Sequence, residues 1–199
     1  MTFDNKLVNE FMKDNKLNII EEDGKRPWGD WYIIRLEKQF DTKVLRVIPK
    51  TLLSLQYHGT PTHQGHSEKW VACTNIRALI SKQSAIGLSK EELTKSLNEM
   101  IMVDIKAGGT LIIGPGIIHA LANPFDDDIY VIETRLSEIV ETSKDREDNI
   151  VRIYDQTNRN GTPSFPPNLV KRILDPASSP DYIVNDGTIF DISKFNKNK

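Results

Sequence analysis

The chain has 199 residues, of which 38% are hydrophobic and 27% charged, and its formal net charge is −2. This size and composition are typical of one globular domain with a substantial core, and the small net charge gives no reason to expect nucleic acid or a membrane as a partner. The single cysteine, Cys73, excludes an internal disulfide and fits a reducing compartment. Because no signal peptide or membrane span is evident, we expect a cytoplasmic protein.

The N-terminal segment is predicted to be helical. Apolar residues from Phe3 to Met12 recur at helical spacing among charged ones, which indicates an amphipathic helix packed on the outside of a sheet. An acidic connector follows, so residues 1–24 form the helix and its connector. The sequence from Arg26 to Gly29, RPWG, then opens a main domain over residues 25–159.

Short apolar–polar alternations separated by turns predict that this main domain is all-β. A helix is inserted between residues 89 and 101, where Ser89 and Glu92 match a capping box. The pattern favours an antiparallel double-sheet jelly roll with ligands on the inward strand faces. The expected strands are residues 31–36, 43–48, 52–58, 69–73, 76–80, 102–105, 110–113, 119–122, 129–134 and 150–154.

The last part of the chain, residues 160–199, is rich in proline. We expect an extension that packs on the barrel or on a partner subunit in a homodimer. Within it, a short helix is predicted at 169–174 and a strand at 188–192.

Four side chains form a candidate metal site. Alternation puts Gln56 and His58 on one strand face, Glu68 returns on the next extended segment, and His119 follows a Gly-Pro-Gly turn. Imidazole, carboxylate and amide ligands suit zinc, and also manganese, iron or nickel, and such a cage can keep a position open for substrate oxygens. Each residue alone is more often a hydrogen-bonding surface or core residue. Together the four side chains predict a site for one divalent metal, with zinc as the first candidate.

Two more histidines lie in the loop before Glu68. His66 has three open readings: a replacement ligand, an acid or base, or a hydrogen-bonding loop residue. We treat it as a candidate catalytic residue. For His63 we favour a polar loop residue.

Several motifs occur in a recognisable order: RPWG, LSLQYH from Leu53, SEKW from Ser67, GPGIIHALAN from Gly114, and EDNIVRIYD from Glu147 to Asp155. Over roughly residues 25–159 they resemble the cupin-type phosphomannose isomerases. The resemblance implies a cupin-type double-stranded β-helix. It also implies that Gln56, His58, Glu68 and His119 bind a divalent metal, usually zinc, and that Arg152 helps to polarise the substrate.

The implied activity is a metal-dependent aldose–ketose isomerisation of a phosphorylated sugar, from mannose 6-phosphate to fructose 6-phosphate. The phosphate site stays open among Lys43, Arg159, Arg152 and Arg46, and Trp28 is a candidate pocket-lining residue. The catalytic base stays open among His66, Lys69 and a metal-bound water. The alternatives are a non-catalytic sugar- or metal-binding cupin, and an isomerase or epimerase of another sugar.

Overall fold

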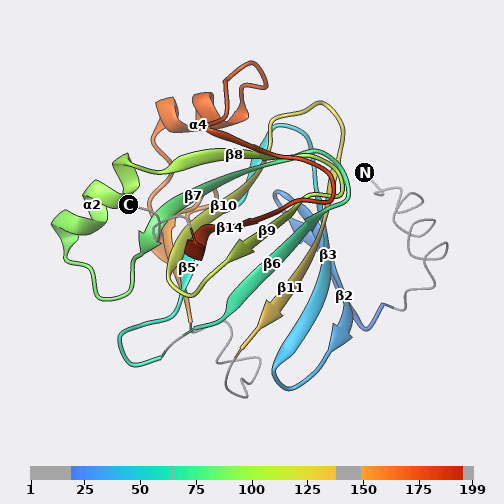
Figure 1. Ribbon diagram of the computed structural model, residues 1–199, viewed down its shortest axis with the longest axis horizontal. Coiled ribbons are helices and arrows are strands. Elements are labelled where there is room, and N and C mark those ends of the chain that lie inside the picture. Colours follow the sequence, from blue (N-terminus) through green and yellow to red (C-terminus); the bar gives the residue numbers. More distant parts are fainter. Residues whose placement is uncertain (1–18, 64, 138–148, 195–199) are drawn as a thin grey trace.

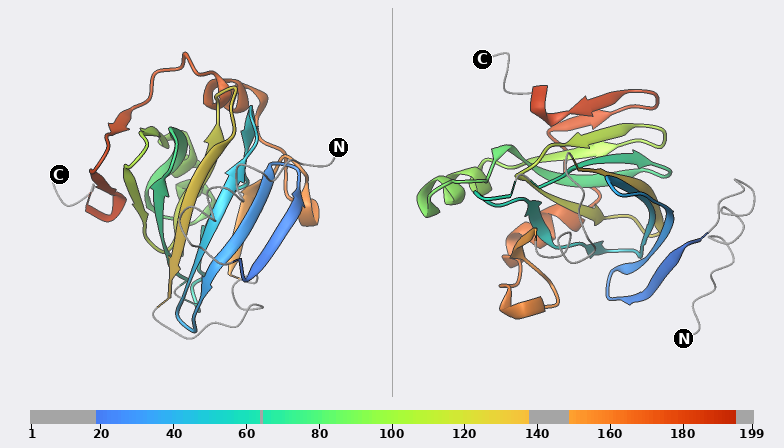
Figure 2. Two further views of the ribbon diagram at one scale, coloured as in Figure 1. Left: turned by 90° about the vertical axis from the view of Figure 1, so that its right-hand side faces the viewer. Right: turned by 90° about the horizontal axis from the view of Figure 1, so that it is seen from below.

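Two seven-stranded sheets face each other and enclose an apolar core (Figure 1, Figure 2). The computed structural model describes residues 19–63, 65–137 and 149–194. The first sheet has the order β1 (Glu21–Arg26), β2 (Gly29–Leu36), β3 (Phe40–Val47), β11 (Ile129–Leu136), β6 (Ser67–Ala72), β9 (Thr110–Ile113) and β14 (Ile189–Asp191). The second has the order β12 (Ile150–Tyr154), β5 (Leu55–His58), β10 (Ile117–Asn123), β7 (Ile76–Ser84), β8 (Ile101–Ile105) and β13 (Tyr182–Val184), with β4 (Thr51–Leu52) also paired to β10.

The expected all-β, cupin-type jelly roll is confirmed, as two facing sheets whose described strands do not close into one barrel. The core forms because each strand directs every second side chain between the sheets. Leu45, Trp70 and Val131 of the first sheet join Ile80 and Leu121 of the second in one buried cluster. Burying an aliphatic side chain of this kind contributes roughly 1.5–3 kcal/mol, so the core fixes which strand positions face inward.

The inserted helix is confirmed as α2 (Lys90–Asn98). Its capping box is present, because the Ser89 hydroxyl accepts from the Glu92 backbone N–H and the Glu92 carboxylate accepts from the Ser89 N–H. The helix ends before Ile101, since that residue already pairs with Ile80 as the first residue of β8. The extension carries a 3₁₀ turn (Arg159–Gly161) and α4 (Pro167–Leu174).

Two strand predictions needed correction. The acidic connector is in part the edge strand β1, which pairs with β2; an edge strand needs only backbone hydrogen bonds and tolerates charged side chains. The single strand expected over residues 52–58 is divided into β4 and β5, because the pairing with β10 shifts by one residue between them. The predicted N-terminal helix lies outside the described residues.

The C-terminal extension adds a strand to each sheet. β13 pairs in parallel with β8, and β14 pairs in parallel with β9, so both lie on one flank of the sandwich (Figure 1). The strand expected at residues 188–192 is confirmed as β14, whereas β13 was not predicted. The opposite flank, where β12 and β5 face β2 and β3, contains the candidate site described below.

Arg77 ties the extension to the second sheet. Its guanidinium is 1% exposed and donates to both carboxylate oxygens of Asp104, at 2.6 and 3.0 Å. It also donates to the backbone carbonyls of Ile173, Asp175 and Ser178. A cation at the C-terminus of α4 satisfies carbonyls that the helix leaves without partners. None of the helices in the described ranges is long and apolar enough to cross a membrane.

Candidate metal centre

Glu68 lies at the centre of a buried polar cluster inside the sandwich. It shares the inward face of β6 with Trp70, and its side chain is 4% exposed. Its Oε1 lies 2.9 Å from His58 Nε2 and its Oε2 lies 3.4 Å from His119 Nε2. The indole N–H of Trp70 donates to Oε2 at 2.9 Å. One carboxylate therefore joins histidines that come from two neighbouring strands of the opposite sheet.

Strand pairing brings the other predicted ligands to this carboxylate. His119 of β10 pairs with Gln56 of β5, and the amide nitrogen of Gln56 lies 3.5 Å from His58 Nε2. His119 donates from Nδ1 to the carbonyl of Ile117 at 2.8 Å; a carbonyl only accepts, so Nδ1 carries the hydrogen. In the neutral ring, Nε2 then holds a lone pair, and it is buried without a hydrogen-bond partner.

This arrangement fits a cation. Nε2 of His119 and Oε2 of Glu68 both present lone pairs to each other across 3.4 Å, and a buried divalent ion would satisfy both. The hydrogen bond from His119 Nδ1 to a backbone carbonyl is the kind of support that orients metal-binding imidazoles. The cluster therefore fits the expected divalent metal.

The charge state of the cluster also suits a metal. Burial lowers the pKa of His58 to about 3, against the opposing effect of Glu68, so its imidazole is neutral near pH 7. Burial would raise the pKa of Glu68, but His119 and His58 outweigh it and hold that pKa well below its usual range. A neutral His58 imidazole beside an ionised Glu68 carboxylate is the combination of protonation states that metal binding by these two residues requires.

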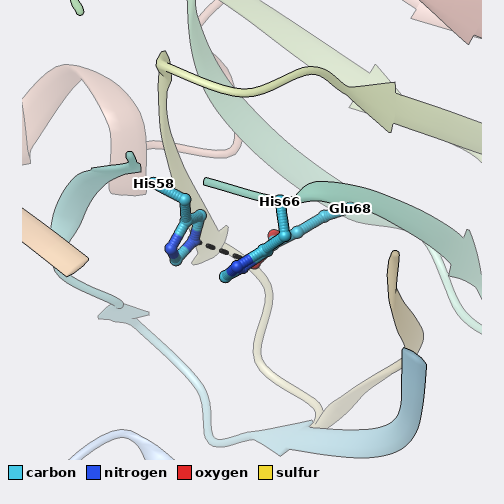
Figure 3. A group of neighbouring side chains, drawn as sticks. All are labelled: His58, His66 and Glu68. Carbon is cyan, nitrogen blue, oxygen red and sulfur yellow. Dashed lines mark ion pairs between the residues drawn. The ribbon is translucent and has the colours of Figure 1, made fainter. Parts of the chain in front are cut away.

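His66 belongs to the same cluster. Its ring stacks on His58 at 4.0 Å between ring centroids, and its Nε2 lies 3.7 Å from Glu68 Oε1 (Figure 3). One ligand atom each from His58, His66 and Glu68 lie within 4.8 Å of one another. His63 behaves as a polar loop residue, since its Nδ1 accepts from the Gly65 N–H at 3.2 Å.

A pocket reaches this cluster from the flank of the sandwich. Of the site residues predicted from the sequence, seven line this pocket: Trp28, Lys43, Gln56, Glu68, His119, Arg152 and Arg159. His58 and His66 are buried beside it. Arg159 is held by Asp155, and its Nη2 donates to the hydroxyl of Ser54 at 3.3 Å. Lys69, a base candidate, is an exposed residue of β6 outside this lining.

Glu133 is the main pocket residue that the sequence analysis missed. It is 9% exposed and lies 3.9 Å from Lys43 Nζ. Burial and the charge of Glu68 raise the pKa of Glu133 to about 7, against the effect of Lys43. The available signal was its spacing, because it follows the buried Ile129 and Val131 at every second position of β11. Arg26 and Trp31, also missed, line the same pocket.

Residues 13–155 match the family described as mannose-6-phosphate isomerase C-terminal. No curated protein matches the chain. Similar solved structures include the capsular polysaccharide assembling protein CapF from Staphylococcus aureus, with 12% identity and a TM-score of 0.48 over 68% of this chain and 33% of that chain. Another is the Lactobacillus farciminis oxalate decarboxylase formate complex, with 11% identity and a TM-score of 0.45 over 80% and 42%.

The chain thus spans about a third of the CapF chain, and similarities at this level of identity concern the fold alone. The family match is of a different kind, because it covers most of the main domain and every residue of the Glu68 cluster. The chain belongs to the mannose-6-phosphate isomerase C-terminal family of cupin domains.

Proposed function

We propose that this protein is a metal-dependent isomerase that converts mannose 6-phosphate to fructose 6-phosphate. The observation that carries the proposal is the lining of one pocket, which combines the Glu68 cluster with a buried carboxylic acid and several cations. Such an isomerisation needs these three elements: an electrophile at two adjacent substrate oxygens, an acid–base group near the carbons, and a site for the phosphate.

The Glu68 cluster supports the first element. Glu68, His58 and His119 would hold the cation, zinc in first place, with the fourth ligand considered below. When bound, a divalent metal supplies Lewis acidity that polarises a carbonyl and stabilises negative charge on its oxygen. Trp70 keeps the Glu68 carboxylate in place through its 2.9 Å hydrogen bond.

Glu133 is the best-supported acid–base group. It faces the same pocket as Glu68, and its position beside Lys43 is compatible with both protonation states. In the proposed reaction the Glu133 carboxylate takes the proton from C2 of the aldose and returns it to C1, while the O2 hydroxyl proton moves to O1. No atom is gained or lost. A carboxylate whose pKa lies near the working pH suits this reversible transfer, and burial and the charge of Glu68 raise that of Glu133 to about 7 in the metal-free protein.

Cationic side chains in the pocket support the third element. Arg152 and Arg159 line it together with Arg26, and a phosphate dianion prefers such donors. Arg159 is already oriented by Asp155, so it loses little side-chain freedom on binding. A homodimer, a cytoplasmic location, and the lack of nucleic-acid and membrane partners stay predictions.

The proposal is tested by a coupled assay of fructose 6-phosphate formation on protein of measured metal content. We expect chelator-sensitive turnover in the wild type. Glu133→Gln should lower kcat by about 10²–10⁴ with unchanged metal content, whereas the exposed control Glu91→Gln should match the wild type. Full turnover by Glu133→Gln would exclude the assigned base. Bound metal without any turnover of mannose 6-phosphate would instead favour a sugar-binding cupin or another sugar substrate.

A further inference from the structure

A chain of hydrogen bonds determines which end of the Gln56 amide faces the metal cluster. Asp155 holds Arg159, and Arg159 Nη2 donates to Ser54 Oγ at 3.3 Å. Ser54 Oγ in turn lies 2.8 Å from Gln56 Oε1. A guanidinium has no acceptor, so the Ser54 hydroxyl must accept from Arg159 and direct its own hydrogen elsewhere. Gln56 Oε1 is the acceptor within reach.

The Gln56 amide consequently presents its nitrogen to the cluster. With Oε1 bound to Ser54, the NH₂ group is the end that lies 3.5 Å from His58 Nε2. Amide hydrogens carry partial positive charge and cannot coordinate a cation, whereas they are good donors to a substrate hydroxyl or carbonyl oxygen. In this orientation Gln56 suits the substrate better than the metal.

His66 is the other candidate for this ligand position. It is 2% exposed, inward-facing, and stacked on His58, with its Nε2 3.7 Å from Glu68 Oε1. It is also a member of the group whose ligand atoms lie within 4.8 Å of one another, with His58 and Glu68. A neutral imidazole is a stronger ligand for zinc than a carboxamide, so His66 suits the fourth ligand position beside Glu68, His58 and His119 better than Gln56 does.

We infer that His66, and not Gln56, completes the metal centre, and that Gln56 donates its amide N–H to a substrate oxygen under the control of Ser54 and Arg159. The role of Gln56 rests on the proposed function, whereas the role of His66 requires only that a metal binds. The arrangement links the phosphate-binding Arg159 to the group beside the reacting carbons through two hydrogen bonds.

The test measures Zn²⁺ affinity of the metal-free full chain by competition with a chromophoric chelator, without any sugar. His66→Asn should weaken Zn²⁺ binding by about 100-fold or more, while Gln56→Ala should change it by less than about threefold. His63→Asn is the matched control, since it removes a histidine from the same loop and should leave the affinity unchanged. The inference requires the loss in His66→Asn to exceed that in Gln56→Ala by about tenfold; any smaller difference overturns it.

Separate measurements distinguish a loss of folding from a loss of metal coordination. Variants are compared at matched far-UV circular dichroism, and His66→Phe, which keeps the buried ring volume, replaces His66→Asn if the latter unfolds. X-ray absorption of the zinc-loaded wild type should count one more imidazole than in the His66 variant; an equal count refutes the ligand assignment.

The substrate role is tested by kinetics on the same samples. Gln56→Ala and Ser54→Ala should raise KM for mannose 6-phosphate by about tenfold at full metal occupancy, and Ser54→Ala should leave Zn²⁺ affinity within about threefold. An unchanged KM in both variants overturns the donor role. If no sample turns over mannose 6-phosphate while the Zn²⁺ affinities follow the expected order, the isomerase proposal fails and the His66 assignment stands.

Discussion

Trp70 and Glu68 share one face of β6, and the indole N–H of Trp70 donates to Glu68 Oε2 at 2.9 Å. Trp70 is 3% exposed and packs edge-on against His119. It therefore contacts two candidate ligands, Glu68 and His119. Trp70→Phe removes the hydrogen bond while keeping an aromatic ring at the position. We expect Zn²⁺ affinity, measured by chelator competition, to fall by about 10- to 100-fold.

Trp31→Phe is the control, because Trp31 lines the pocket next to Lys43 without touching the Glu68 carboxylate. Its Zn²⁺ affinity should equal that of the wild type. Equal affinities in both variants would show that the indole contributes nothing to metal binding.

Gly65 lies in the loop that connects His58 to His66. Its φ is +75°, and a Cβ there would lie 2.5 Å from the carbonyl oxygen of His58. Gly87 has φ +79° but nothing within 4 Å of its Cβ position, so Gly87→Ala should cost only the left-handed strain, about 1–2 kcal/mol. Gly65→Ala should cost more, because backbone must move, and should weaken Zn²⁺ binding by about tenfold or more through displaced His58 and His66. Urea unfolding and chelator competition measure the two effects.

Strand alternation made much of the site predictable. Gln56 was placed by alternation, Glu68 by the next extended segment and His119 by a turn, all three as parts of one site, and the pocket contains all three. Alternation within a strand does not predict which other strand pairs with it. The approach of Glu133 to Lys43 depends on the pairing of β11 with β3, which places these two residues, 90 positions apart in the sequence, directly opposite each other. Long-range register of this kind leaves no local signal.

The C-terminal extension illustrates a second limit of prediction from the sequence. β13 has only three residues, and two of them, Tyr182 and Ile183, are exposed. Its stability comes from backbone pairing with β8 and from the Arg77 anchor, not from an amphipathic pattern that a reading of sequence can detect. His66 was recognised but left with three roles, since the stacking on His58 that favours a ligand role depends on the loop conformation.

Arg77 should be among the most sensitive positions for stability. Arg77→Ala leaves the partly buried carboxylate of Asp104 and the carbonyls of the extension without their partner. We expect the free energy of unfolding in urea to fall by about 3–5 kcal/mol. The control is Arg172→Ala, because Arg172 is exposed and lies 3.8 Å from Asp181; it should change stability by less than about 1 kcal/mol. A loss in Arg77→Ala no larger than in the control would contradict the anchoring role.

Glu133 should give the metal-free protein a characteristic pH dependence. The folded-state pKa is about 7, above the ordinary value of 4.5, so between these values the native state binds more protons at this group than the unfolded state. The stabilising contribution of Glu133 to the free energy of unfolding is fully present below pH 4.5. It is lost as the pH rises through 7, by about 3 kcal/mol in total.

The measurement is urea unfolding of chelator-treated wild type and Glu133→Gln from pH 4.5 to 8. Other groups titrate in both proteins, so the informative quantity is the difference between their free energies of unfolding. That difference should shift in favour of the variant as the pH rises, because glutamine does not ionise in the buried site. Glu91→Gln should parallel the wild type, since Glu91 is exposed. A difference between wild type and Glu133→Gln that stays constant with pH would mean that Glu133 is ionised in the pocket throughout, which would contradict its raised pKa.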